Sequence, residues 1–449
     1  MKITLSVLGL SFAGVLSGCS PVVSVHPLYT EDEVKKPYLD QRVEGEWMTS
    51  SLDDFDENDA THKPPCHVSV SKPTKGEFPY TVEFHCPGSK AEPGETYSKY
   101  DVHLLSLGAD TFFDARFAES DEKGKHISLK DIEETGVAPA HIVGEVWVQH
   151  DFVRFAPLAS DWVESNWPGD FLVRSKIKQF SSVDILTNQT EDLRNLLSRN
   201  AGSPSAFGFP LFLCRAGADC DARAVADQLA RTPDDGDVLE GAAKFYKKRG
   251  DFARAIGLER HKITSEKGAG KDQFELARLL LLSRDFEGAR RALTTADEPT
   301  RGPSVKVLVV RSYFLQGDYA GTVRAAKSLA DAKNLISADP IILSYFALHR
   351  MGKAKEAEAH LKEQVASFVG PGQEQLYLLD VSGRVTNGLE TAEDKDRRTY
   401  YYALNALKSG NIEHGRGHLE DLAKRLAKDD LTGLAAQIEL ERLSSTTNK

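Results

Sequence analysis

The chain has 449 residues, more than one ordinary domain needs, so two or three domains are expected. Hydrophobic residues make up 41% and charged residues 27%, a balance typical of soluble globular domains rather than of a disordered chain or a membrane bundle. The formal net charge is -11, which would be repelled by phosphate backbones, so no nucleic-acid partner is expected.

The first 18 residues have the composition of a signal peptide. Lys2 supplies a positive charge, and residues 3–16 are apolar or small, a run too short for a stable membrane span. The following Leu16-Ser17-Gly18-Cys19 resembles the lipobox of bacterial lipoproteins. This resemblance implies a mature protein that begins at an acylated Cys19. Stable anchoring then requires more than one acyl chain, because a single chain binds membranes only weakly.

The lipobox resemblance also implies a location. Ser20, in place of Asp, implies sorting to the outer membrane, so a lipid-anchored protein of the cell envelope that faces the periplasm is expected. Residues 19–42 contain Pro21, Pro27 and Pro37 among mixed charges. They are predicted to form a tether that lifts the body off the membrane.

Four cysteines follow Cys19 in the chain. An exported protein meets an oxidising compartment, so disulfides are expected, and four cysteines allow three pairings. Local geometry favours Cys66–Cys86 and Cys214–Cys220.

A hairpin is predicted around Gly76. Cys66 and Cys86 are symmetric about this residue, and so are His67 and His85, so each pair would face across the hairpin on its own side. The cysteines would then form a cross-strand disulfide. Two imidazoles are too few for a structural metal site, so neither a metal nor a cofactor is expected.

Residues 43–188 are predicted to form an antiparallel β-barrel or sandwich. Segments 66–71 and 80–86 alternate apolar and polar residues around a turn-rich stretch. Further strands are expected at 101–107, 111–117, 141–148, 152–156 and 182–186. Short antiparallel strands at this spacing are typical of both architectures.

Two resemblances concern this β-domain. His26-Pro-Leu-Tyr29 and Phe112-Phe-Asp114 resemble motifs of bacterial lipoproteins without an assigned function. Gly45-x-Trp47 resembles the first-strand signature of lipocalins, in which the tryptophan closes one end of the barrel. That resemblance implies a barrel that holds a ligand. The alternative is a small barrel filled by its own side chains.

The rest of the chain is predicted to be helical. Residues 189–232 are expected to be a helix, starting near Thr190, and an irregular connector. In residues 233–445, Asp251, Asp285, Asp318 and Lys353 follow turn residues at spacings of 34, 33 and 35. This period resembles tetratricopeptide repeats and predicts an all-α solenoid of helical hairpins. The longer interval to Asn411 predicts an insertion at about 370–395.

A partner-binding groove is predicted on the repeats. By resemblance to the repeat family, the first helix of each hairpin lines a concave face. Lys244, Arg278 and Arg311 recur there once per repeat, and the aromatics Phe274, Phe314 and Phe346 lie on the same face. A basic ladder with interleaved aromatics favours a protein or acidic peptide partner.

The expected function is therefore a non-enzymatic, membrane-anchored scaffold that binds another envelope protein. No G-x-S-x-G or H-E-x-x-H motif occurs, and no catalytic residue is assigned. One alternative is a lipocalin-like carrier of a lipid or another apolar ligand. The other is an enzyme whose dispersed site is not recognisable in one sequence.

Overall fold

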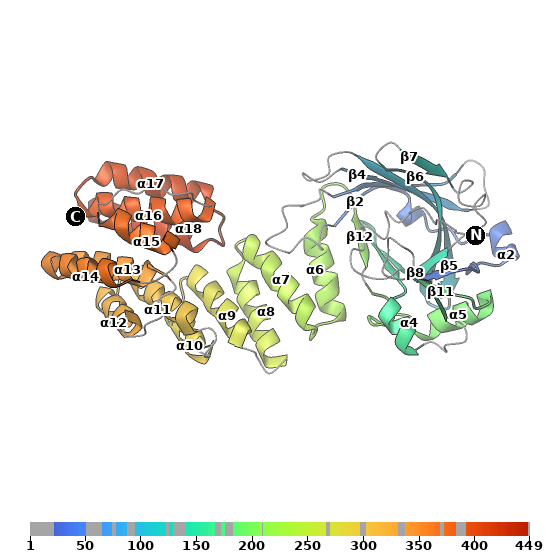
Figure 1. The fold of residues 1–449 in the computed structure, drawn as a ribbon. Coiled ribbons are helices and arrows are strands. Elements are labelled where there is room, and N and C mark those ends of the chain that lie inside the picture. The colour runs from blue at the N-terminus through green and yellow to red at the C-terminus, as the bar shows by residue number, and fades with distance from the viewer. Residues whose placement is uncertain are drawn as a thin grey trace, which may run out of the picture. The chain divides into compact units, whose positions relative to one another are not determined.

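The computed structural model divides into two compact units, residues 1–232 and residues 233–449. Each unit is described by itself (Figure 1). The described residues are 22–50, 65–73, 78–87, 95–122, 125–128, 141–166, 172–175, 183–208, 210–265, 270–296, 302–330, 337–368, 372–382 and 392–447.

The first unit is a closed antiparallel barrel of eight strands. In barrel order the strands are β2 (Gly45–Thr49), β3 (His67–Ser71), β4 (Tyr80–Cys86), β5 (Thr96–Leu107), β6 (Asp110–Glu122), β8 (His141–Val148), β9 (Phe152–Pro157) and β12 (Leu211–Cys214). Every neighbouring pair is antiparallel, and β12 pairs back onto β2 to close the ring. The predicted fold class is confirmed, and the β-domain is a barrel rather than a sandwich.

The barrel extends further along the chain at its C-terminal end than predicted. Strand β12 lies inside residues 189–232, which were expected to hold only a helix and a connector. The prediction failed because Leu211-Phe-Leu-Cys214 is apolar at every position and buried on both faces, so it lacks the alternation that marks a half-exposed strand. The expected helix is present as α5 (Thr190–Arg199).

The predicted tether is wrong from Val22 onward, because these residues pack on the barrel. Strand β1 (Val22–Ser24) pairs with β8 and, in parallel, with β11 (Val183–Leu186). Leu28 is fully buried, and its backbone N–H donates to the Asp114 carboxylate at 2.6 Å.

The smaller elements of this unit surround the barrel strands. They are α2 (Glu31–Lys35), the 3-10 turn η1 (Gln41–Val43), β7 (Lys125–Ser128), α4 (Ser160–Asn166), β10 (Leu172–Ser175) and α6 (Cys220–Arg231).

Side chains fill the barrel interior. Trp47 is buried, and its indole N–H donates to the Val43 carbonyl at 2.8 Å. The Arg215 guanidinium lies 3.7 Å from the centre of the indole ring. The cavity among Val82, Phe84, Tyr100, Val102, Phe113, Ala115 and Phe155 measures about 10 Å³, room for roughly one water molecule. This cavity is too small for a lipid, so it gives the carrier alternative no support.

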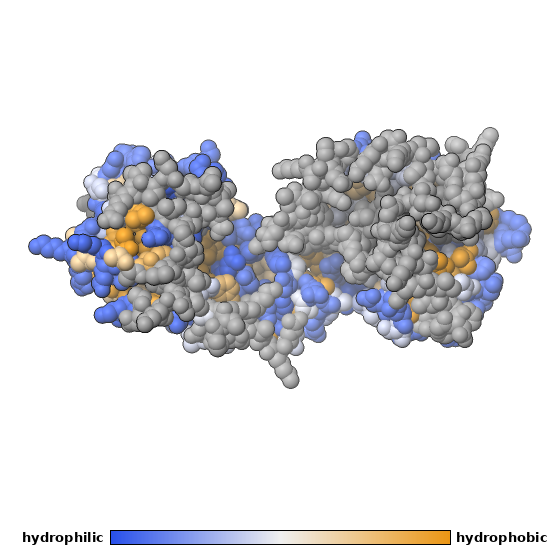
Figure 2. Space-filling view, viewed as in Figure 1, coloured by the Kyte–Doolittle hydropathy of each residue, from blue (hydrophilic) through white to orange (hydrophobic). Residues whose placement is uncertain are grey.

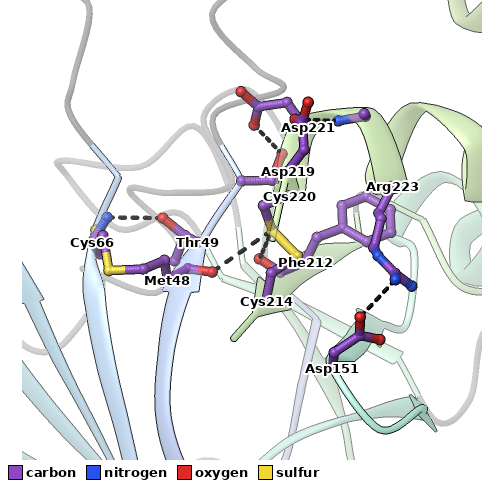
Figure 3. The surroundings of a disulfide bond; sticks show 12 residues. Met48, Thr49, Cys66, Asp151, Phe212, Cys214, Asp219, Cys220, Asp221 and Arg223 are labelled. Atoms are coloured by element: carbon purple, nitrogen blue, oxygen red, sulfur yellow. Dashed lines mark hydrogen bonds and ion pairs between the residues drawn. A yellow bond between two sulfur atoms is a disulfide. The ribbon is translucent and has the colours of Figure 1, made fainter. Parts of the chain in front are cut away.

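Both expected disulfides are formed. Cys66 is bonded to Cys86, and the β3–β4 register places His67 opposite His85, as the symmetry about Gly76 predicts. Cys214, the last residue of the barrel, is bonded to Cys220, the first residue of α6 (Figure 3). This second bond therefore ties α6 to the strand that closes the barrel.

The second unit consists of stacked helical hairpins. Four regular pairs are α7 (Gly236–Lys248) with α8 (Phe252–Ser265), α9 (Gly270–Leu282) with α10 (Phe286–Ala296), α11 (Gly302–Gln316) with α12 (Tyr319–Ala330), and α13 (Asp339–Arg350) with α14 (Ala354–Ser367). Then follow α15 (Gly372–Val381), α16 (Ala392–Lys408), α17 (Ile412–Arg425) and α18 (Leu431–Thr447). The predicted insertion at 370–395 contains α15.

The 34-residue period has a physical cause at each turn. The turn glycines Gly250 and Gly317 have positive φ, which lets the first helix end and the chain reverse. The aspartate that follows accepts a backbone N–H of the second helix, as Asp285 does from Gly288 at 2.8 Å. The small residue four positions later is fully buried, as at Ala289. No helix among the described residues is long and apolar enough to cross a bilayer.

Candidate functional site

The candidate site is the face formed by the first helices of the hairpins, α7, α9, α11 and α13 (Figure 1). All six predicted groove residues belong to these helices. The structure separates them into two groups, one on α7 and α9 and one on α11 and α13.

The group on α7 and α9 is partly open to solvent. The side chains of Lys244 and Arg278 are 38% and 33% exposed. Each is already paired within its own helix, Lys244 with Glu240 at 3.1 Å and Arg278 with Glu275 at 3.4 Å. Phe274 is partly buried against the core of these hairpins. This surface, which we call the α7–α9 face, therefore presents paired opposite charges rather than free cations.

The group on α11 and α13 is covered, and the predicted groove is wrong there. Phe314 and Phe346 are buried core residues with at most 2% exposure, so neither is a surface anchor. Arg311 is half-buried, and its Nε donates to the Asp339 carboxylate at 2.6 Å. The cause is that the chain folds back after α14 and places α16 and α18 over these helices.

Helix α18 runs past the C-terminal ends of three first helices. Glu439 pairs with Arg350 of α13 at 2.5 Å. Arg442 donates to the carbonyls of Phe314 and Leu315, at the end of α11. Glu441 pairs with Arg284, which follows α9.

This covering helix was not anticipated from the sequence, although a signal was present. Leu434, Ala435, Ala436 and Ile438 are all buried. Apolar residues in such close succession point in several directions around a helix, which is typical of a helix that is enclosed by its neighbours.

Under α16, two arginines share one buried aspartate. Asp339, the first residue of α13, pairs with Arg311 and with Arg397, and it accepts the Tyr401 hydroxyl. Burial alone would raise the pKa of Asp339, but the two guanidinium groups outweigh burial and lower the pKa to about 2. Arg397 pairs as well with Glu374 at 2.9 Å. Through these pairs the network joins α11, α13, α15 and α16.

A second charge cluster lies beneath the α7–α9 face. Lys262 of α8 donates to Glu240 at 2.6 Å and pairs with Asp272 at 3.3 Å. The Lys262 hydrogen bond, with support from Lys244, lowers the pKa of Glu240 to about 2. Nearby Glu259 is buried, and desolvation together with the surrounding carboxylates raises its pKa to about 7, although Lys262 opposes this shift.

No group of three or more His, Cys, Asp or Glu side chains in the described part of the chain is placed to hold a metal ion. The predicted lipidation site, Cys19, lies outside the described residues.

The described surface visible in Figure 2 carries both polar and apolar side chains. On the side shown in Figure 2, hydrophilic residues dominate the described surface, with small apolar patches between them. The large hydrophobic side chains that are exposed among the described residues are Tyr38, Leu39, Trp147, Met351, Tyr402 and Ile412.

Comparison with known proteins leaves the chain without an assigned family. No family model and no curated protein matches it. A solved structure, of Naa15/Naa10 bound to HypK-THB, aligns with 51% of this chain and 31% of that chain at 19% identity, with a TM-score of 0.25. The chain thus spans about a third of that neighbour. Because the TM-score is low, the fold assignment rests on the helices and strands themselves.

Proposed function

We propose that the protein is a non-enzymatic, membrane-anchored envelope lipoprotein whose helical repeats bind a protein partner. The observation that carries the proposal is the α7–α9 face. Although α18 contacts α9, the Lys244 and Arg278 side chains on this face are 38% and 33% exposed, and it displays these charged groups on a rigid helical scaffold.

The chemistry of this face favours a partner with acidic side chains. An incoming carboxylate competes with Glu240 for Lys244 and with Glu275 for Arg278, so binding exchanges one ion pair for another. Each new ion pair replaces an existing one, so the exchange adds little net affinity. It contributes mainly to specificity, because only a partner with carboxylates at the right positions can make it. Phe274 adds apolar area beside Arg278.

In this proposal the barrel is a compact support. Its interior is occupied by side chains, and two disulfides reinforce it, as expected for a protein exposed to an oxidising envelope. Residues from Val22 onward pack on the barrel, so at most Ser20 and Pro21 would separate the body from an acylated Cys19. The barrel would therefore lie close to the membrane surface.

The anchor is tested by replacing Cys19 with serine. The Cys19→Ser protein should leave the membrane fraction, and mass spectrometry of the wild type should find an N-terminal peptide that starts at an acylated Cys19. Wild-type protein without acylation would contradict the proposal. So would a variant that still sediments with membranes after washing with high salt and carbonate.

A further inference from the structure

A pair of histidines on α17 has no role in the proposed scaffold function. His414 and His418 lie one helical turn apart, and their Nε2 atoms are 3.2 Å from each other. The two rings face each other edge to face, with centroids 4.5 Å apart. His414 is exposed and His418 is half-buried, so both ring edges are reachable from solvent.

The separation of the two nitrogens matches what one metal ion requires. Zinc binds imidazole nitrogen at about 2.0–2.1 Å, so two nitrogens at tetrahedral positions lie roughly 3.3 Å apart. The observed 3.2 Å is therefore close to the spacing needed for both Nε2 atoms to bind the same ion. Histidines at positions i and i+4 share one face of a helix, which is how helical zinc sites present their ligands.

The helix that carries the pair is held firmly. Leu419 and Leu422 are fully buried, and Gly415 packs so closely on α16 that a Cβ there would meet Leu407 at 2.7 Å. Because this side of α17 is fixed against α16, the backbones of His414 and His418 are fixed as well. A site on a rigid element binds its ion with little loss of conformational entropy.

We propose that His414 and His418 form a surface site for a divalent transition-metal ion of the nickel, copper and zinc group. Imidazole suits these ions, whereas magnesium and calcium prefer oxygen ligands. No third His, Cys, Asp or Glu joins the pair among the described residues. Two protein nitrogens therefore bind the ion, and water fills the remaining positions. The bound ion would link two side chains that lie one turn apart on α17. Because the ion binds the folded helix, it would stabilise the helical unit by mass action.

A second histidine pair in the chain provides a matched control. His67 and His85 face each other across β3 and β4. Each already lies near a carboxylate, with His67 Nε2 at 3.2 Å from Glu46 and His85 Nδ1 at 3.3 Å from Glu95. Replacing this pair removes the same number of imidazoles and leaves α17 intact.

The test is calorimetric titration of the full chain, without a histidine tag and freed of metal, with Zn²⁺ and with Ni²⁺. Wild type should bind one ion per chain. His414→Gln and His418→Gln should each bind about tenfold more weakly or worse, because one imidazole alone loses the chelate effect. The His67→Gln/His85→Gln control should bind like wild type, and circular dichroism should show unchanged helix content in all variants.

Three results would overturn the proposal. They are no binding of either ion to the wild type, wild-type affinity in both single variants on α17, and loss of binding in the β3–β4 control. Acidification should also weaken binding, because an imidazole must be neutral to bind a metal. Affinity that does not fall in acid would argue against histidine ligands.

Discussion

The buried carboxyl of Glu259 makes the stability of the helical unit depend on pH near neutrality. Glu259 lies on α8, is 6% exposed, and its Oε2 has no hydrogen-bond partner in the described part of the chain. Burial raises its pKa from 4.5 to about 7, helped by Asp272 and other carboxylates and opposed by Lys262. Glu259→Gln replaces this group by one that stays neutral at every pH.

The sign and size of the effect follow from linkage. The folded chain holds the Glu259 proton more tightly than the unfolded chain, so its contribution to stability is fully present below pH 4.5 and is lost as pH rises through about 7. Each pKa unit corresponds to about 1.4 kcal/mol, so the shift from 4.5 to about 7 gives a total loss of at most roughly 3.5 kcal/mol. Glutamine avoids this loss but forgoes the attraction to Lys262. We therefore expect Glu259→Gln to stabilise the unit by about 1–3 kcal/mol at pH 8.

The assay is urea unfolding at pH 5 and pH 8, followed by circular dichroism at the helix band. All four tryptophans, at positions 47, 147, 162 and 167, precede residue 233, so tryptophan fluorescence reports separately on the barrel unit. The variant and the wild type should be nearly equal at pH 5 and should diverge at pH 8. The barrel signal should not change.

A matched control is Glu287→Gln, at an exposed glutamate on α10 in the next hairpin. It should change stability by no more than about 0.5 kcal/mol at either pH. The reasoning about Glu259 would be refuted if Glu259→Gln were as stable as wild type at pH 8. It would also be refuted if the gain were the same at pH 5, because a pH-independent gain would reflect packing rather than titration.

The remaining predictions concern Arg311 and the longer disulfide. Arg311→Ala should lower the free energy of unfolding of the helical unit by about 3 kcal/mol, because it removes one of the two arginines bound to buried Asp339. Arg278 is half-exposed and pairs with Glu275 of its own helix, so Arg278→Ala should cost no more than about 0.5 kcal/mol. Equal losses of unfolding free energy in the two variants, measured with urea, would contradict the division of the predicted groove into a group on α7 and α9 and a group on α11 and α13. Replacing Cys66 and Cys86 by alanine should destabilise the barrel by roughly 3 kcal/mol, since their bond closes a loop of 20 residues. An unchanged fluorescence midpoint would refute that expectation.

Local rules predicted much of this fold. The helical turns follow from residues that act within a few positions, such as Asp285 capping α10 beside the buried Ala289. The β3–β4 register follows from the symmetric cysteines and histidines of the hairpin. In each case the interaction partners are close in the chain, so the sequence pattern predicts the contact that the structure contains.

Long-range packing was not predictable in the same way. Strand β12 is apolar throughout and closes the barrel far from its partner β2 in sequence, so no alternation marks it. The covered half of the groove depends on α18, whose contacts with Arg350 and with the end of α11 span about a hundred residues. The repeat spacing placed all six predicted groove residues on first helices, but it carries no information about which of them another segment covers.

The central claim, that the α7–α9 face binds a protein partner, is tested most directly by photo-crosslinking in cells. A benzophenone amino acid replaces Phe274 on this face or, in the control, Arg291, which is 70% exposed on α10. We predict a defined crosslinked partner from position 274, none from position 291, and loss of the product when Lys244 and Arg278 are both changed to alanine. The same products from both positions, or a crosslink that survives the double change, would contradict the account.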